Sequence, residues 1–79
     1  MSRSQTVTIS SYTRGGAYEE GSYGGEKLSK LLADYNVVAG EAEVEVTGAD
    51  GEERRTAVNM VLREDDTIII MKKKNKSGL

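Results

Sequence analysis

The sequence predicts an α+β fold in which a mixed sheet of four to five strands packs on one helix. The clearest indication is the run at residues 67–71, which is apolar on both of its faces and therefore belongs inside a sheet and not at its edge. One amphipathic helical pattern covers residues 26–35, and alternating strand patterns precede and follow it. This order of apolar segments predicts a small sheet wrapped on one helix.

The chain is predicted to form a single domain, because 79 residues are too few for two separate cores. A domain of this size buries only roughly 60% of its unfolded surface, so its stability is marginal. We expect residues 1–5 to form a flexible N-terminus, residues 6–72 to form the domain, and residues 73–79 to form a basic flexible tail.

Two strands are predicted before the helix. Val7 and Ile9 alternate with threonine and serine in residues 6–11, which is typical of a strand with one buried face. Residues 15–25 contain five glycines, and glycine at this density marks turns. We therefore expect a hairpin turn at the start of this segment and a short second strand over residues 17–23.

The helix is predicted over residues 26–35. Apolar side chains at intervals of three and four residues form one face, and they are Leu28, Leu31, Leu32 and Tyr35. Glu26 is expected in the first turn, where it favours the helix dipole. Asn36 is expected to end the helix in a left-handed conformation, with Val37 and Val38 close to the core.

Three further strands are predicted after the helix. Residues 42–47 alternate between apolar and polar, which indicates one buried and one acidic face. An Asp-Gly turn at residues 48–51 leads into a return strand at residues 53–57. An apolar connection at residues 58–62 is expected to pack under the sheet, and the acidic turn at residues 65–66 leads into the last strand.

The last strand is expected in the middle of the sheet, beside the first strand and parallel to it, with the helix in the connection between them. Ile68 and Ile70 would then point to one side of the sheet, and Ile69 and Met71 to the other. One pair should face the helix and the other should lie on the open face, and the sequence leaves open which pair is which.

The predicted order of two strands, a helix and three more strands resembles the ubiquitin-like β-grasp fold. Within that fold the chain is most similar to the sulfur carriers of thiamine and molybdopterin biosynthesis, the ThiS/MoaD group. The matching features are a helix entry with paired leucines, a third strand with its turn, and an acidic turn before a hydrophobic strand, at residues 25–32, 43–48 and 61–70. Since β-grasp domains often bind partners through the open sheet face, the resemblance implies such a role here.

The C-terminus departs from the sulfur-carrier pattern. Those carriers act through a C-terminal Gly-Gly, which has no side chains and can thread a narrow channel to the activating enzyme. This chain instead ends in Ser77, Gly78 and Leu79. A sulfur carrier or protein modifier is therefore an alternative function that requires processing of the C-terminus to Gly78.

The charge is unevenly placed along the chain. Four of its eleven basic residues lie in residues 72–79, which leaves seven basic and thirteen acidic side chains in residues 1–71, a balance of −6. An acidic body repels phosphates and argues against nucleic-acid binding by the fold itself. A further alternative is a nucleic-acid-associated accessory protein that binds through the lysines of the tail, Lys72, Lys73, Lys74 and Lys76. Without such a partner, the tail is expected to be a solvated end of the chain.

The composition excludes several kinds of catalytic site. The chain has no cysteine and no histidine, so it has neither a thiolate nor a Ser–His pair, and only carboxylates remain as ordinary metal ligands. The glycine-rich segment fits neither the phosphate-loop nor the dinucleotide-binding spacing. Glu41, Glu43 and Glu45 share one strand face, where a solvated surface paired with Arg54 or Arg55 is expected rather than a calcium site. We expect no enzymatic activity, no cofactor and no metal.

A cytoplasmic protein is the expectation for its location. No apolar stretch approaches the roughly 20 residues of a membrane span, so no membrane partner is expected. Residues 1–5 carry one charge without an apolar segment behind it, which does not fit a signal peptide.

The predicted function is a non-catalytic module that binds another protein through its open sheet face. The candidate contact residues are the exposed pair of the last strand together with two tyrosines, so the full set is Ile68, Ile69, Ile70, Met71, Tyr18 and Tyr23. Packing in the core or at an edge is the favoured role for the two tyrosines, and an exposed tyrosine near glycine would suit an adaptable contact surface. Self-association is also left open.

Overall fold

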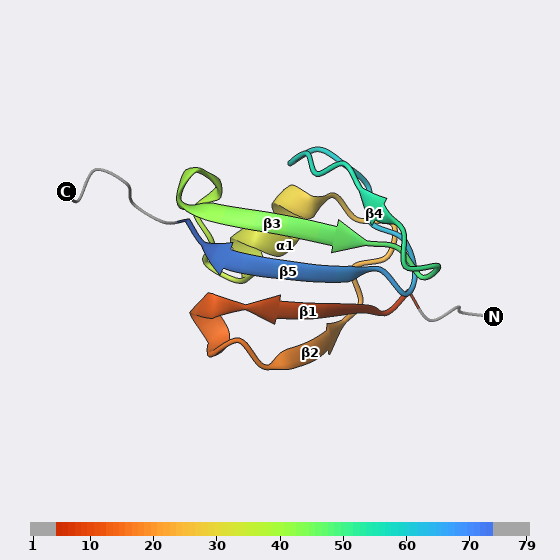
Figure 1. The fold of residues 1–79 in the computed structure, drawn as a ribbon, viewed down its shortest axis with the longest axis horizontal. Coiled ribbons are helices and arrows are strands. Elements are labelled where there is room, and N and C mark those ends of the chain that lie inside the picture. The colour runs from red at the N-terminus through yellow and green to blue at the C-terminus, as the bar shows by residue number, and fades with distance from the viewer. Residues whose placement is uncertain (1–4, 74–79) are drawn as a thin grey trace.

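The computed structural model describes residues 5–73 as one five-stranded sheet with one α-helix and two short 3₁₀ helices (Figure 1). The elements in chain order are β1 (Val7–Ser11), η1 (Tyr12–Arg14), β2 (Tyr18–Gly21), α1 (Leu28–Asp34), η2 (Ala39–Glu41), β3 (Ala42–Thr47), β4 (Glu53–Arg54) and β5 (Thr67–Lys72).

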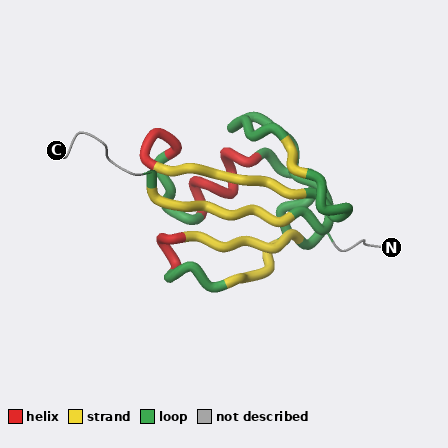
Figure 2. The backbone as a smooth tube through the Cα atoms, viewed as in Figure 1, coloured by secondary structure: helices red, strands yellow, loops and turns green. Residues whose placement is uncertain are grey.

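Strand β5 occupies the centre of the sheet, whose order is β2-β1-β5-β3-β4. It runs parallel to β1 and antiparallel to β3, while β2 and β4 are the antiparallel edges. The predictions of a central last strand and of a parallel pairing with the first strand are therefore confirmed. The helix covers one face, behind β3 and β5 in Figure 1, and the tube in Figure 2 shows that loops and short 3₁₀ turns make the other connections.

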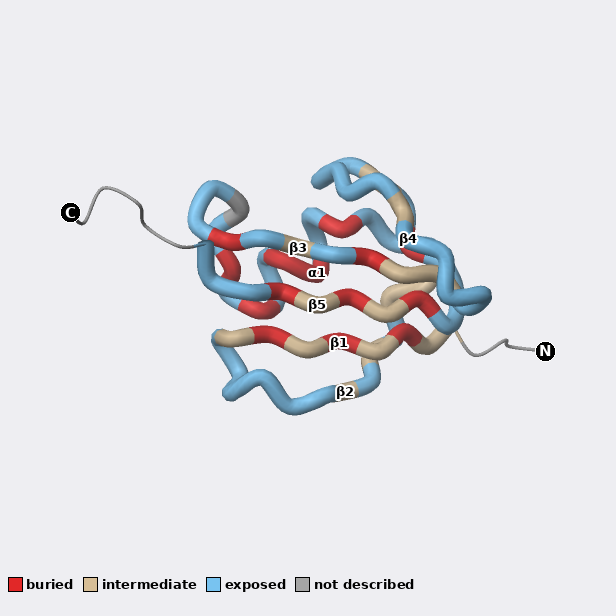
Figure 3. Tube along the Cα trace, in the orientation of Figure 1, coloured by how far each residue is buried: buried red, intermediate tan, exposed pale blue. Residues whose placement is uncertain are grey.

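The core lies between the sheet and the helix. Ile68 and Ile70 are buried there, together with Val7, Ile9 and Val46 from the neighbouring strands. Buried positions alternate with half-buried ones along β1 and β5, as the period of two requires (Figure 3). The predicted helix face is confirmed, because all four of its side chains are buried, namely Leu28, Leu31, Leu32 and Tyr35. Each large apolar side chain buried in this way contributes about 1.5–3 kcal/mol.

The helix begins two residues later than predicted, and Glu26 is not in its first turn. Lys27 takes the position before the helix without a side-chain cap. Instead, the N–H groups of Leu28 and Ser29 donate to the carbonyl oxygens of Met60 and Val58, both at 2.9 Å. A distant segment of backbone thus satisfies the first donors of the helix, which a side chain would otherwise cap.

The end of the helix agrees with the sequence in one respect and differs in another. Asn36 has φ +58°, so the predicted left-handed stop is confirmed. Val37 is buried as expected, whereas Val38 is exposed and the prediction for it is wrong. The turn directs only the first valine inward.

The return strand is shorter than predicted, since β4 covers two residues and not residues 53–57. The chain leaves the sheet after Arg54, and the segment that follows supplies the two carbonyl groups that receive the helix N–H groups. The apolar connection is also less buried than expected: Leu62 is buried and Met60 half-buried, but Val58 and Val61 are exposed. Strand β2 likewise ends earlier than predicted, at Gly21.

Candidate functional site

The face of the sheet opposite the helix forms a continuous surface across four strands. Directly paired residues of neighbouring strands point to the same side of a sheet. Tyr18 of β2 pairs with Ser10 of β1, Ser10 pairs with Ile69 of β5, and Ile69 pairs with Glu45 of β3. These four residues therefore form one row across this surface. We call the whole surface opposite the helix the open face.

The apolar part of the open face consists of Tyr18, Ile69 and Met71. Tyr18 is 67% exposed and Met71 is 40% exposed, while Ile69 is half-buried. Between Tyr18 and Ile69 lies only the small side chain of Ser10, whose hydroxyl donates to the carbonyl oxygen of Gly16 at 2.8 Å. The structure thus decides between the two pairs of β5.

The other pair, Ile68 and Ile70, belongs to the core. Their side chains are 0% and 2% exposed, so a partner cannot reach them without unfolding the domain. Of the six residues named from the sequence, these two serve the packing of the helix on the sheet.

Glutamates flank the apolar residues of the open face, beside Tyr18 on β2 and on the β3 and β4 side of β5. They come from four positions on three strands, and each is exposed: Glu20, Glu43, Glu45 and Glu53. Half-buried threonines fill the row between them, at Thr8, Thr67 and Thr47. Within residues 5–73, none of the four glutamates makes a hydrogen bond or an ion pair through its side chain. The predicted pairing of Glu41, Glu43 and Glu45 with Arg54 or Arg55 is therefore wrong for the described residues, since Glu41, which lies in η2, makes no such side-chain contact there either.

Tyr23 lies after β2 and packs toward the helix. Its hydroxyl donates to Asp34 Oδ2 at 2.7 Å, and its ring meets Tyr35 edge to face with the centroids 6.4 Å apart. Burial, together with the hydrogen bond to the Asp34 carboxylate and the charge of that carboxylate, raises the pKa of Tyr23 to about 12. The structure thus places Tyr23 in the packing role, on the side of the sheet away from Tyr18.

The turn between β1 and β2 is fastened to the same helix end. The guanidinium of Arg14 lies 4.5 Å from the centroid of the Tyr35 ring and pairs with Glu19 at 3.5 Å. The hydroxyl of Thr13 donates to the Tyr35 carbonyl oxygen at 2.8 Å. These contacts fix β2, and with it Tyr18, relative to the helix.

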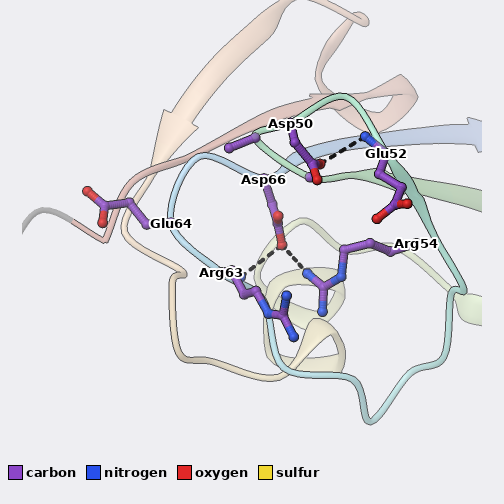
Figure 4. A pocket seen from close by; sticks show the side chains of 8 residues that line it. Asp50, Glu52, Arg54, Arg63, Glu64 and Asp66 are labelled. Atoms are coloured by element: carbon purple, nitrogen blue, oxygen red, sulfur yellow. Dashed lines mark hydrogen bonds and ion pairs between the residues drawn. The ribbon is translucent and has the colours of Figure 1, made fainter.

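A polar site separate from the open face lies at the end of the sheet where β5 begins (Figure 4). The Asp66 carboxylate is 1% exposed and accepts from the Arg54 guanidinium and from the backbone N–H of Arg63, the latter at 2.8 Å. The guanidinium also donates to the Val61 carbonyl oxygen at 3.1 Å. Arg54 and Asp66 line a pocket together with the β3–β4 turn. The residues that line this pocket are Gly48, Ala49, Asp50, Glu52, Arg54, Arg63, Glu64 and Asp66.

The Arg54–Asp66 pair did not emerge from the sequence. Asp66 was predicted as a turn residue, and the turn is present, since its neighbour Asp65 has φ +68°. However, a partner twelve positions away leaves no periodic signal, and an acidic doublet in a turn is typical of exposed residues. Arg54 and Asp66 hydrogen-bond to each other, so the pocket offers no unpaired buried group to a ligand. The pocket is therefore best described as a junction between two loops.

The remaining predicted sites fall at the C-terminal end. Lys72 ends β5 and Lys73 follows it, both exposed, and the N–H of Lys73 donates to the Glu41 carbonyl oxygen at 2.9 Å. The other two lysines of the nucleic-acid alternative and the glycine of the carrier alternative lie outside the described residues, namely Lys74, Lys76 and Gly78.

Two kinds of site are absent from residues 5–73. No group of three or more acidic side chains there is arranged to hold a metal ion. No helix in this part of the chain is long and apolar enough to cross a membrane.

Comparison with protein-family models, with curated proteins and with solved structures found no match for this chain. The open face and its residues therefore carry the functional argument by themselves.

Proposed function

We propose that the chain is a β-grasp domain that works as a non-catalytic protein-binding module, using the open face as its contact surface. The strand order β2-β1-β5-β3-β4, the parallel pair in the middle and the single helix on one face support the β-grasp assignment. That arrangement leaves one side of a well-paired sheet uncovered within residues 5–73.

One observation carries the functional proposal: β5 is apolar on both faces although only one face packs on the helix. Ile69 and Met71 face away from the core, on the same side of the sheet as the exposed ring of Tyr18. A side that faces only solvent would favour polar residues, such as the threonine of β1 and the glutamates of β3 on the same side of the sheet. Apolar and aromatic side chains at the centre of a polar rim are typical of a protein-binding surface.

The test compares two matched double variants of β5. We expect Ile69→Lys/Met71→Lys to keep the far-UV circular dichroism of the native chain, because both side chains lie on the open face. We expect Ile68→Lys/Ile70→Lys to unfold the domain, because it buries two ammonium groups in the core.

Binding is then measured by capturing proteins from native extract on the wild-type chain and on the folded variant, with quantitative mass spectrometry. A partner enriched on the wild type and lost from the folded variant supports the proposal. Loss of the folded state in both variants, or identical captured proteins on both, would contradict an open-face contact surface. A cytoplasmic location remains a prediction that fractionation of native cells would check.

A further inference from the structure

We infer that the open face recognises a cationic segment of its partner, in which lysine or arginine side chains flank apolar ones. This inference rests on the proposed function and adds the chemistry of the partner to it. Two observations lead to it, the charge of the rim and the size of the apolar centre.

The rim of the open face is mainly acidic. Four exposed glutamates project from its strands, namely Glu20, Glu43, Glu45 and Glu53. The exposed Lys73 follows β5 opposite Glu41, and strand alternation places it at one end of the same face, beyond Met71. Arg54 belongs to the other side of β4, where it pairs with Asp66. Around the helix, by contrast, both signs are exposed, with Lys27, Lys30 and Asp34. The excess of negative charge is thus a property of the open face and not of the helix side of the domain.

Two of these carboxylates, those of Glu43 and Glu45, are close enough to repel each other. Glu43 and Glu45 are two positions apart on one strand, about 7 Å by strand geometry. The screening length at physiological ionic strength is about 8 Å, so their repulsion is only partly screened. Because none of the four pairs with a described cation, a partner that brings positive charge relieves this repulsion and gains attraction at long range.

The apolar centre sets the size of the segment. The row from Tyr18 through Ser10 and Ile69 to Glu45 crosses four strands, or about 14 Å at the usual strand spacing. An extended peptide covers that distance with about four residues at roughly 3.3 Å each. Two apolar side chains can contact Tyr18, Ile69 and Met71, and basic residues on either side reach the glutamates.

The experiment selects ligands for the full chain from a random dodecapeptide library displayed on phage. Ile69→Thr/Met71→Thr serves as the counter-selection, since threonine keeps the strand propensity and the net charge while removing the apolar centre. Circular dichroism verifies that this variant is folded. The selected peptides are synthesised, and their Kd values are measured by fluorescence anisotropy at low and at physiological salt.

The charge is then tested with Glu43→Gln/Glu45→Gln. We expect the selected peptides to carry net positive charge and to bind this variant about two- to thirty-fold more weakly, from two exposed charge pairs. The matched control is Glu26→Gln/Glu64→Gln, which changes the net charge equally at exposed positions outside the sheet and should alter Kd less than two-fold. Binding to the wild type should also weaken as salt rises.

Each other outcome overturns a defined part of the reasoning. Peptides that need Ile69 and Met71 but are neutral or acidic, with no effect of the glutamate substitutions, overturn the cationic partner and leave the proposed function standing. A library in which no peptide distinguishes the wild type from the threonine variant overturns both. If sedimentation shows that the wild type is a dimer and the threonine variant is not, the open face binds a second copy of the chain. If peptides bind only after residues 74–79 are deleted, the open face binds the chain's own tail. Either result refutes the inference.

Discussion

The contact between Arg54 and Asp66 is expected to hold the β3–β4 hairpin against the turn that leads into β5. Asp66 is 1% exposed, and the Arg54 side chain is 20% exposed. Removing one partner of a fully buried pair costs about 3–5 kcal/mol, because a charge is left buried without compensation. Since Arg54 keeps some contact with water, we expect Arg54→Met to cost about 2–4 kcal/mol.

The second variant removes the charge that Arg54→Met leaves behind. Asp66→Asn keeps a side-chain oxygen for the backbone N–H of Arg63, so the double variant Arg54→Met/Asp66→Asn has no uncompensated charge. We expect the double variant to be about 1–3 kcal/mol more stable than Arg54→Met alone. Arg55→Met at the exposed neighbouring position is the control and should change the stability by less than about 0.5 kcal/mol.

The assay is urea unfolding followed by circular dichroism, with linear extrapolation to water. A domain of this size has a total stability of about 4–12 kcal/mol, so the predicted loss is a large fraction of it. If Arg54→Met cost less than about 1 kcal/mol, or if adding Asp66→Asn made it less stable still, the pair would not be the junction that the structure indicates.

Two further predictions concern a tyrosine and the C-terminus. The pKa of Tyr23 in the folded state is about 12, above the ordinary value of 10.0. The stability that its protonated form contributes is therefore complete below pH 10 and is lost as the pH rises toward 12. In a spectrophotometric titration, Tyr23→Phe should remove the latest phenolate transition, and an unchanged late transition would contradict the assignment. The intact mass of the protein from native cells should correspond to an unprocessed chain without adducts, whereas loss of Leu79 with sulfur added at Gly78, or a ladder of conjugates, would favour the carrier or modifier function.

Periodicity in the sequence was sufficient for the features that depend on burial. The four-residue helix face and the position of β5 in the middle of the sheet follow from which residues are apolar and how they are spaced. The same pattern cannot say which of two equally apolar pairs faces the helix. That choice depends on the register of β5 with β1, in which Ile68 pairs with Ile9 and Ile69 with Ser10.

Features that depend on distant polar contacts were not predictable. The helix begins at Leu28 because two carbonyl groups from Met60 and Val58 receive its first N–H groups, and no capping residue marks that position in the sequence. A backbone carbonyl has no residue identity, so such a cap is invisible until the chain is folded.

The edges of the sheet favour the open face over strand addition as the way to bind a partner. Strand β4 pairs only with Val46 and Thr47, which leaves residues 42–45 of β3 as an outer edge within the described chain. Glu43 and Glu45 lie on that edge, and exposed charge on an edge strand opposes pairing with another chain. At the opposite edge, β2 spans only four residues, short of the usual strand length of about 5–6 residues. The glutamates thus have two consequences: they discourage association through the strand edge, and they set the charge that a partner must bring to the face.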